Sequence, residues 1–199
     1  MNYKKATLEE IDMIYNTFMV EDFPPAELKP LNAIKYSVQK GWYSVYIAYD
    51  EHGIKGYACI AVIDCNNDGN LSGGVKSFGF LDYFAIVKQQ RGTGVGTEFF
   101  KNLTRLSETD CIILETESIE SAKDAHEDFI RRRRIAFYKR SGCIDTGCMY
   151  NVFGVEYNVF ISRDIELTPD FLAKLLSAYE YAYAAILRRD DKDYIFRVK

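Results

Sequence analysis

The sequence has little histidine, a residue that metal sites and catalytic triads commonly use. Its two histidines, His52 and His126, fall in a turn and in a polar stretch, so neither a Ser-His-Asp triad nor a two-histidine metal site is favoured. The formal net charge is −4 with both signs interspersed, which gives no positive field for a nucleic acid backbone. We therefore expect no bound metal and no nucleic acid partner.

Cysteine pairs and long apolar runs are also missing. The number of cysteines is odd, at five, and no two of them have the C-x-x-C spacing typical of zinc or redox sites. No apolar run approaches the roughly 18 residues that span a bilayer. These features predict reduced thiols in a cytoplasmic protein that does not insert into a membrane.

Proline is scarce too, with only four residues in a chain that is 48% hydrophobic and 15% aromatic. This hydrophobic and aromatic content is higher than that of a disordered chain, and 199 residues suffice for one sizeable core. We therefore expect a single domain spanning residues 1–199.

Hydrophobic periodicity and turn residues divide the first half of the chain into helices and a hairpin. Thr7 and Glu10 form a potential capping box for a helix that ends near Val20. The further expected elements are a helix over 26–40, paired strands over 42–49 and 56–63, a polar loop over 65–74 that can act as a lid, and a buried strand over 78–87.

The second half predicts alternating helices and strands and ends in a long helix. The expected elements are helices over 94–106 and 127–140 and strands over 111–116, 143–152 and 155–161. The crossover rule makes the strand over 111–116 parallel to that over 78–87. Thr168 and Pro169 open the last helix, expected over 168–188, whose apolar residues, Tyr179 among them, should form core.

A glycine-rich turn, Arg91-Gly92-Thr93-Gly94-Val95-Gly96, joins the buried strand to the following helix. Glycines at alternate positions let a ligand approach the backbone closely, and the helix adds its positive end. This arrangement suits the pyrophosphate of a coenzyme. A dinucleotide-binding fingerprint, with Glu115 as its acidic residue, and a purely structural turn remain alternatives, whereas the missing Gly-Lys-Ser/Thr ending excludes a P-loop.

Two blocks of the chain resemble the GNAT superfamily of N-acetyltransferases. The segment Leu81–Phe100 is similar to the family's coenzyme-binding strand, turn and helix, and its signature Q/R-x-x-G-x-G/A can be laid on Arg91–Gly96 or on Gln89–Gly94. Residues Ile135–Cys143 resemble the second block, an apolar-Tyr pair followed by a glycine stop. The order of the other elements also matches the family over most of the chain, and only the last helix is extra.

The resemblance implies a mixed α/β fold with a twisted, mostly antiparallel sheet of about seven strands, flanked by helices. In that fold the parallel strand pair splays to admit acetyl-CoA, the co-substrate. By the same resemblance, the turn Arg91–Gly96 binds pyrophosphate, and the backbone of Ala85, Ile86 and Val87 binds the pantetheine arm and polarises the acetyl carbonyl. Tyr138 matches the proposed general acid, which protonates the departing thiolate.

A carboxylate is expected to take the proton of the attacking amine, since the amine must be neutral to react. Asp82 lies in the coenzyme strand, and Glu115 and Glu117 lie at the end of the adjacent strand on one face by period two. Each of the three carboxylates is a candidate for this base. We expect Asp82 and Glu115 in catalysis and Glu117 in binding.

The acceptor is expected near the connection of the first two helices, where Phe23 and Glu27 offer aromatic and acidic groups to a cationic amine. A solvated loop is the alternative. The expected reaction is acetyl transfer from acetyl-CoA to an amine of a small molecule or peptide. A non-catalytic acyl-CoA sensor, with the last helix as a homodimer contact, is the second hypothesis.

The sequence departs from the family before the apolar-Tyr pair, where Arg131 and Arg134 replace the common Asn and Ala. This run of arginines, Arg131–Arg134, lies in a helical pattern and is expected to be a solvated or ion-paired helix surface, with a contact to a coenzyme phosphate as the alternative.

Overall fold

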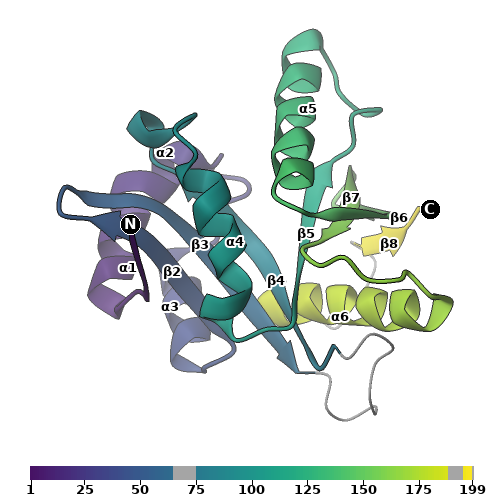
Figure 1. Ribbon diagram of the computed structural model, residues 1–199, viewed down its shortest axis with the longest axis horizontal. Helices are drawn as coiled ribbons and strands as arrows, with labels where there is room; N and C mark the ends of the chain where they lie inside the picture. The colour runs from purple at the N-terminus through teal and green to yellow at the C-terminus, as the bar shows by residue number, and fades with distance from the viewer. Residues whose placement is uncertain (65–74, 188–194, 199) are drawn as a thin grey trace. The chain divides into compact units, whose positions relative to one another are not determined.

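The computed structural model describes residues 1–64, 75–187 and 195–198, and it consists of two compact units (Figure 1). Unit 1 contains Met1–Val62 and Leu81–Glu108, and unit 2 contains Ile63–Phe80 and Thr109–Lys199. The expected lid over 65–74 lies outside the described residues. The single domain over residues 1–199 stays a prediction.

Unit 1 is built on the strands β1 (Asn2–Lys5), β2 (Tyr43–Asp50), β3 (Gly53–Asp64) and β4 (Ser77–Ile86), which are neighbours in that order. The last residues of β3 and the first of β4 belong to unit 2. β1 pairs with β2 and β2 with β3, both antiparallel, as the expected hairpin requires. Aromatic and β-branched residues fill β2, which explains its buried position.

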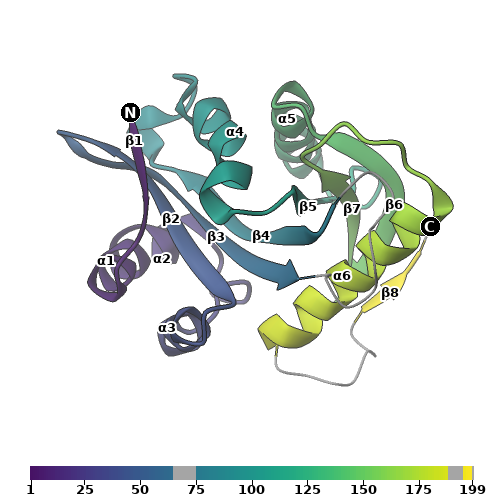
Figure 2. The same cartoon turned by 60° about the horizontal axis from the view of Figure 1, so that its bottom comes forward.

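Helices cover both faces of this sheet (Figure 2). One face carries α1 (Leu8–Ile14), a π-helical turn (Tyr15–Met19), α2 (Val20–Asp22) and α3 (Leu31–Gln39), and the other carries α4 (Val95–Ser107). The capping box of α1 is confirmed, because the Thr7 side chain accepts from the Glu10 N–H and the Glu10 carboxylate accepts from the Thr7 N–H.

The helix predicted over 26–40 begins five residues later than expected, at Leu31. Pro30 adopts φ −57° and ψ 139°, outside the helical region, and it restricts the residue before it as well. Residues 24–27 form a separate turn, in which the Glu27 N–H donates to the Pro24 carbonyl oxygen at 2.9 Å. The helix therefore cannot extend backwards through Pro30.

Unit 2 contains β5 (Cys111–Glu117), β6 (Ile144–Val152), β7 (Val155–Ile161) and β8 (Ile195–Arg197), and the order from β4 is β4-β5-β7-β6-β8. β5 is parallel to β4 over Phe78–Phe80 and Cys111–Ile113, as predicted. Antiparallel pairs join β5 to β7, β7 to β6 and β6 to β8.

Two long helices, α5 (Ala125–Arg140) and α6 (Pro169–Leu187), lie on opposite sides of the unit 2 strands (Figure 2). α6 is the helix expected over 168–188, and the Phe171 N–H donates to the Thr168 hydroxyl at 3.2 Å, which caps its start. The mixed, mostly antiparallel sheet flanked by helices confirms the predicted fold class. β8 was not predicted, because three residues give no periodicity to read.

Candidate functional site

The glycine-rich turn in unit 1 combines left-handed backbone with an uncapped helix end. Gly92 and Gly94 have φ values of +81° and +92°, a region that other residues rarely adopt. Gly94 is the N-cap of α4, and as a glycine it has no side chain to accept a hydrogen bond from the first turn of this helix. A Cβ at either glycine would meet no atom within 4 Å, so the backbone is open to a ligand. The turn thus fits an anion that takes hydrogen bonds from free amides.

The side chain of Arg91 folds back from this turn. Its Nε donates to the Ile86 carbonyl oxygen at 2.8 Å, and its Nη2 lies 2.7 Å from Oδ1 of Asp22, which is itself almost buried, with 7% of the side chain exposed. Tyr57 donates to the other oxygen of Asp22 at 2.9 Å. Arg91 therefore ties the turn to the end of α2, so an anion at the turn would meet backbone N–H groups in place of this side chain.

Hydrogen bonding distinguishes the three backbone positions predicted to hold the coenzyme arm. The Val87 N–H donates to the Lys55 carbonyl oxygen of β3 at 2.9 Å, and the Ala85 carbonyl oxygen would lie 2.9 Å from a Cβ at Gly56. Both groups thus face β3. Because backbone groups alternate along a strand, the N–H of Ile86 points to the edge of β4 opposite β3.

Asp82 of β4 is held by a cation and a phenol. Its oxygens lie 2.6 and 2.8 Å from Lys29 Nζ, and Tyr43 of β2 donates a further hydrogen bond to Oδ2. Only 9% of the Asp82 side chain is exposed. Burial raises the pKa of Tyr43 well above its usual value, and the charge of Asp82 adds to this effect, so the phenol keeps its proton.

The connection between α2 and α3, expected to border the acceptor, rests on Tyr83 of β4. The Tyr83 hydroxyl donates to the Glu27 carbonyl oxygen at 2.7 Å and accepts from the Lys29 N–H at 2.9 Å. Phe23 packs edge-on against the Tyr83 ring at 4.8 Å between centroids. The structure therefore brings Phe23 and Glu27 close to the Asp82 ion pair in unit 1.

In unit 2, the carboxylate of Glu115 accepts two hydrogen bonds from α6. Tyr179 donates to Oε2 and Tyr183 to Oε1, each at 2.5 Å. Burial raises the pKa of both phenols well above the usual value, with the charge of Glu115 as the next cause. Tyr179 is core, as predicted, and it is also a polar partner of a candidate site residue.

Glu117 contacts α5, whereas Glu115 contacts α6, although both lie on β5. The carboxylate of Glu117 lies 3.3 Å from Arg131 Nη2 and 3.0 Å from Arg134 Nη1. The two glutamates, which were expected to share one face, have partners of different charge: phenols for Glu115 and guanidinium groups for Glu117.

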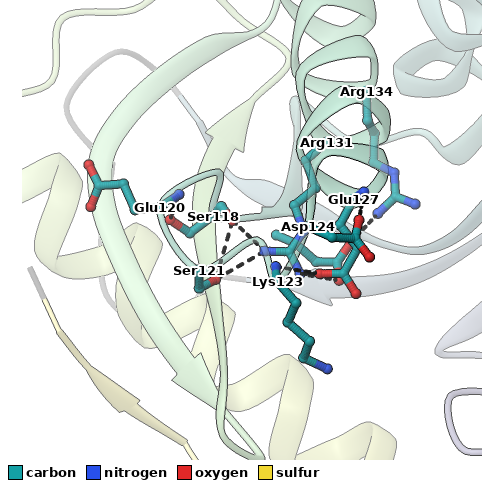
Figure 3. Close-up of polar contacts among 9 residues, drawn as sticks. Ser118, Glu120, Ser121, Lys123, Asp124, Glu127, Arg131 and Arg134 are labelled. Carbon is teal, nitrogen blue, oxygen red and sulfur yellow. Dashed lines mark hydrogen bonds and ion pairs between the residues drawn. The ribbon is translucent and has the colours of Figure 1, made fainter.

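Arg131 is buried, with 6% of the residue exposed, and it organises the connection between β5 and α5 (Figure 3). Its Nη1 donates to the Ser118 carbonyl oxygen at 2.5 Å and to the Ser121 hydroxyl at 3.0 Å. Its Nη2 reaches Glu127 at 3.3 Å as well as Glu117. The arginine run was expected to be a solvated or ion-paired helix surface; Arg131 is ion-paired but buried, because further acceptors come from a segment that helical spacing does not reveal.

Tyr138, the candidate acid, is almost fully buried on α5, with 7% of the residue exposed. Burial raises the pKa of its phenol, Arg134 acts in the opposite direction, and Cys143 adds slightly to the rise. The hydroxyl is therefore protonated at neutral pH, which an acid catalyst requires.

Several partners of the candidate residues were not found from the sequence. They are Lys29 at Asp82, Asp22 at Arg91, and the tyrosines of α6 at Glu115. The one available signal was the spacing of Tyr179 and Tyr183, which places both on one face of a helix.

Comparison with solved structures identifies the fold. A GNAT-family acetyltransferase structure from Bacteroides thetaiotaomicron has a TM-score of 0.65 and 18% identity, covering 92% of this chain and 98% of that chain. The match to a variant of the spermidine N-acetyltransferase of Vibrio cholerae covers 81% of this chain and 94% of that chain, with a TM-score of 0.56 and 9% identity. The match to the ribosomal-protein-S18-alanine N-acetyltransferase of Escherichia coli covers 84% of this chain and 97% of that chain, with a TM-score of 0.55 and 13% identity.

These matches show that the chain has the fold of the GNAT acetyltransferases, which confirms the family resemblance at the level of the fold. No family model and no curated protein sequence matches the chain. The antiparallel pairs described above differ from the parallel sheet of a dinucleotide-binding fold, which removes the alternative role of Glu115.

Two features are absent from residues 1–64, 75–187 and 195–198. None of the helices there is both long and apolar enough to span a bilayer. No group of three or more histidine, cysteine, aspartate or glutamate residues is placed to hold a metal ion in that part of the chain.

Proposed function

We propose that this chain transfers an acetyl group from acetyl-CoA to the amine of a small-molecule or peptide acceptor. The observation that carries the proposal is the turn before α4, where Gly94 caps the helix in a left-handed conformation and leaves the first amides open. A pyrophosphate suits this turn, because its charge is stabilised by the helix end and by several N–H donors at once. The GNAT fold supports the same reading.

In this proposal, residues 91–96 bind the pyrophosphate, and the backbone of residues 85–87 binds the pantetheine arm. We propose that the N–H of Ile86 donates a hydrogen bond to the thioester carbonyl oxygen, since the N–H of Val87 already donates to β3. A backbone donor placed at this oxygen stabilises the negative charge that develops as the amine attacks.

The reaction is direct transfer from the thioester to the amine. The acceptor nitrogen forms a bond to the carbonyl carbon, a base takes the amine proton, and the C–S bond breaks. Tyr138 donates its phenolic proton to the departing thiolate. We assign the base to Glu115 in preference to Asp82, because both oxygens of Asp82 accept from Lys29 and one accepts from Tyr43 as well, which engages this carboxylate in an ion pair.

The proposed acceptor contacts are Phe23, Glu27 and Glu117. Phe23 offers an aromatic face to a cation, and the exposed Glu27 offers a charge. Glu117 is paired with Arg131 and Arg134, so we propose that it orients a polar group of the acceptor.

The first test compares ligands by thermal shift and then measures turnover. Acetyl-CoA should raise the melting temperature and NAD should not. Release of free coenzyme A is then measured with a panel of amines that includes a polyamine and a peptide with an N-terminal alanine. Binding without thiol release for every amine would favour the sensor hypothesis, and no shift with acetyl-CoA would contradict both.

The role of Tyr138 has its own test. Tyr138→Phe keeps the buried ring and removes the hydroxyl, so kcat should fall about 100-fold, within the range for loss of an acid catalyst. Phe137→Tyr, at the neighbouring position, is a control for ring chemistry in this helix. Unchanged kcat in Tyr138→Phe would show that another group protonates the thiolate.

A further inference from the structure

α6 contributes two polar groups to a residue of the sheet, although the family resemblance marks this helix as an addition. Tyr179 and Tyr183 are four residues apart and therefore lie on one face of the helix. Each donates to a different oxygen of Glu115, at 2.5 Å. Both oxygens of one carboxylate are thus held from the same helix, which fixes the orientation of the carboxylate plane.

Aromatic contacts hold the two phenols in place. The ring of Phe80 lies 5.7 Å from that of Tyr179 and 5.4 Å from that of Tyr183, both edge-on. Tyr150 lies 4.7 Å from Tyr179 between centroids, and its hydroxyl donates to Glu180 at 3.1 Å. Because Tyr179 is fully buried and packed on several sides, its hydroxyl has little freedom to leave Glu115.

The chemistry of these partners suits a base. Phenols donate hydrogen bonds without adding a positive charge, whereas the guanidinium groups at Glu117 neutralise their carboxylate. An ionised carboxylate has about four acceptor sites, and the two phenols occupy one on each oxygen of Glu115. The two phenols therefore orient the Glu115 carboxylate and add no positive charge to it.

We propose that Tyr179 and Tyr183 are positioning residues that hold Glu115 as the base for the acceptor amine, so that α6 is a working part of the enzyme. This inference rests on the proposed acetyl transfer. It predicts that activity depends on two hydroxyls that act through Glu115.

The test uses Tyr183→Phe and Tyr179→Phe in the full chain, with Tyr181→Phe as the matched control. Tyr181 lies on the same helix and is 64% exposed. Each positioning variant should lower kcat about tenfold, the order of one hydrogen bond to a charged group, with the KM for acetyl-CoA unchanged. The control should retain the wild-type kcat. Melting temperatures establish that each variant is folded.

The second readout does not need turnover. Loss of a hydrogen bond to the charged form favours the protonated carboxyl, so the midpoint of the Glu115 titration should move to higher pH. It is followed by carbon NMR of the side-chain carboxyls, with Glu115→Gln assigning the signal. The titratable groups near Glu115 or its two phenols include Glu117 of β5, Tyr150 of β6, Tyr157 of β7 and Glu180 of α6, and all are retained in every variant.

The outcomes separate the inference from the proposed function. An inactive wild-type chain would contradict the acetyl transfer itself. An active wild type, with Tyr179→Phe and Tyr183→Phe equal to Tyr181→Phe in kcat or in the Glu115 titration, would overturn the positioning role alone. A fall in kcat together with the shifted titration supports it.

Discussion

Arg91 and Asp22, 69 positions apart in the sequence, form an ion pair of 2.7 Å that anchors the glycine-rich turn to the end of α2. If the turn binds acetyl-CoA through its backbone, as proposed, the pair should act on the affinity by fixing the loop.

The first prediction concerns this pair. Arg91→Ala and Asp22→Asn should each raise the Kd for acetyl-CoA about fivefold, and the double variant should be no worse than either, because both remove one contact. Calorimetric titration measures the effect. Lys88→Ala is the control, since Lys88 pairs at 3.1 Å with the exposed Glu21. Additive effects in the double variant would mean that the two side chains act independently.

The second prediction separates backbone strain from ligand binding. Gly94→Ala and Gly53→Ala both force alanine into positive φ, and each should cost about 1 kcal/mol of folding stability. Only Gly94→Ala should also weaken acetyl-CoA binding, since Gly53 lies in the hairpin between β2 and β3. Urea unfolding and ligand titration measure the two effects. Equal acetyl-CoA affinity in both variants would remove the turn from the binding site.

The third prediction concerns the buried Arg131. Replacing it by methionine leaves Glu117, Glu127 and the Ser118 carbonyl without their common donor, so the free energy of unfolding should fall by about 3 kcal/mol. Arg132→Met, one position along the same helix, should have no measurable effect, because Arg132 is largely exposed and pairs with Asp128. Similar denaturation midpoints for the two variants would contradict the structural role of Arg131.

The fourth prediction uses a buried hydroxyl that has no hydrogen-bond partner in the part of the chain that the structure describes. Thr116 Oγ1 is such a group, so Thr116→Val should stabilise the protein by about 1 kcal/mol. Thr146→Val should have the opposite effect, since the Thr146 hydroxyl donates to the Val159 carbonyl oxygen at 2.8 Å. Thermal and urea unfolding distinguish the signs. Destabilisation by Thr116→Val would indicate that this hydroxyl has an ordered water as partner.

The fifth prediction is a loss of stability at alkaline pH. Burial raises the pKa of Cys111 to about 11 and that of Cys143 to about 12, above the ordinary value of 9.0. The neutral thiols therefore favour the folded state fully below pH 9.0, and this contribution is lost as pH rises towards the folded values.

Unfolding under reducing conditions from about pH 8 to about pH 10.5 checks this sign. Stability should decline more steeply above pH 9.0 in the wild type than in the double variant Cys111→Ala and Cys143→Ala. Each ionising thiol contributes at most about 1.4 kcal/mol per pH unit. Equal slopes would show that other groups cause the decline.

Local signals in the sequence predicted the elements that local geometry determines. Thr7 and Glu10 are three residues apart, and their capping box needs no distant partner. The turn before α4 was likewise readable, because only glycine adopts its backbone angles readily. The helix predicted over 26–40 is shorter in the structure, because Pro30 and the residue before it are kept out of the helical conformation.

The partners of the candidate residues could not be predicted, because they come from distant segments. Asp82 meets Lys29 across 53 positions, and Glu115 meets Tyr179 across 64. The burial of Arg131 depends on the path of residues 118–121, which has no periodic signal. Hydrophobic pattern places residues on a face, but the identity of the polar neighbour follows from the tertiary fold.

The π-helical turn at Tyr15–Met19 has a consequence for the length of the first helical segment. A π turn accommodates one residue more than an α turn, and one residue corresponds to a rotation of about 100° around a helix axis. Asp22 follows this turn directly, so its direction towards Arg91 and Tyr57 depends on the inserted residue. Deleting one residue there would change the helical sequence very little and yet turn Asp22 away from Arg91 and the glycine-rich turn.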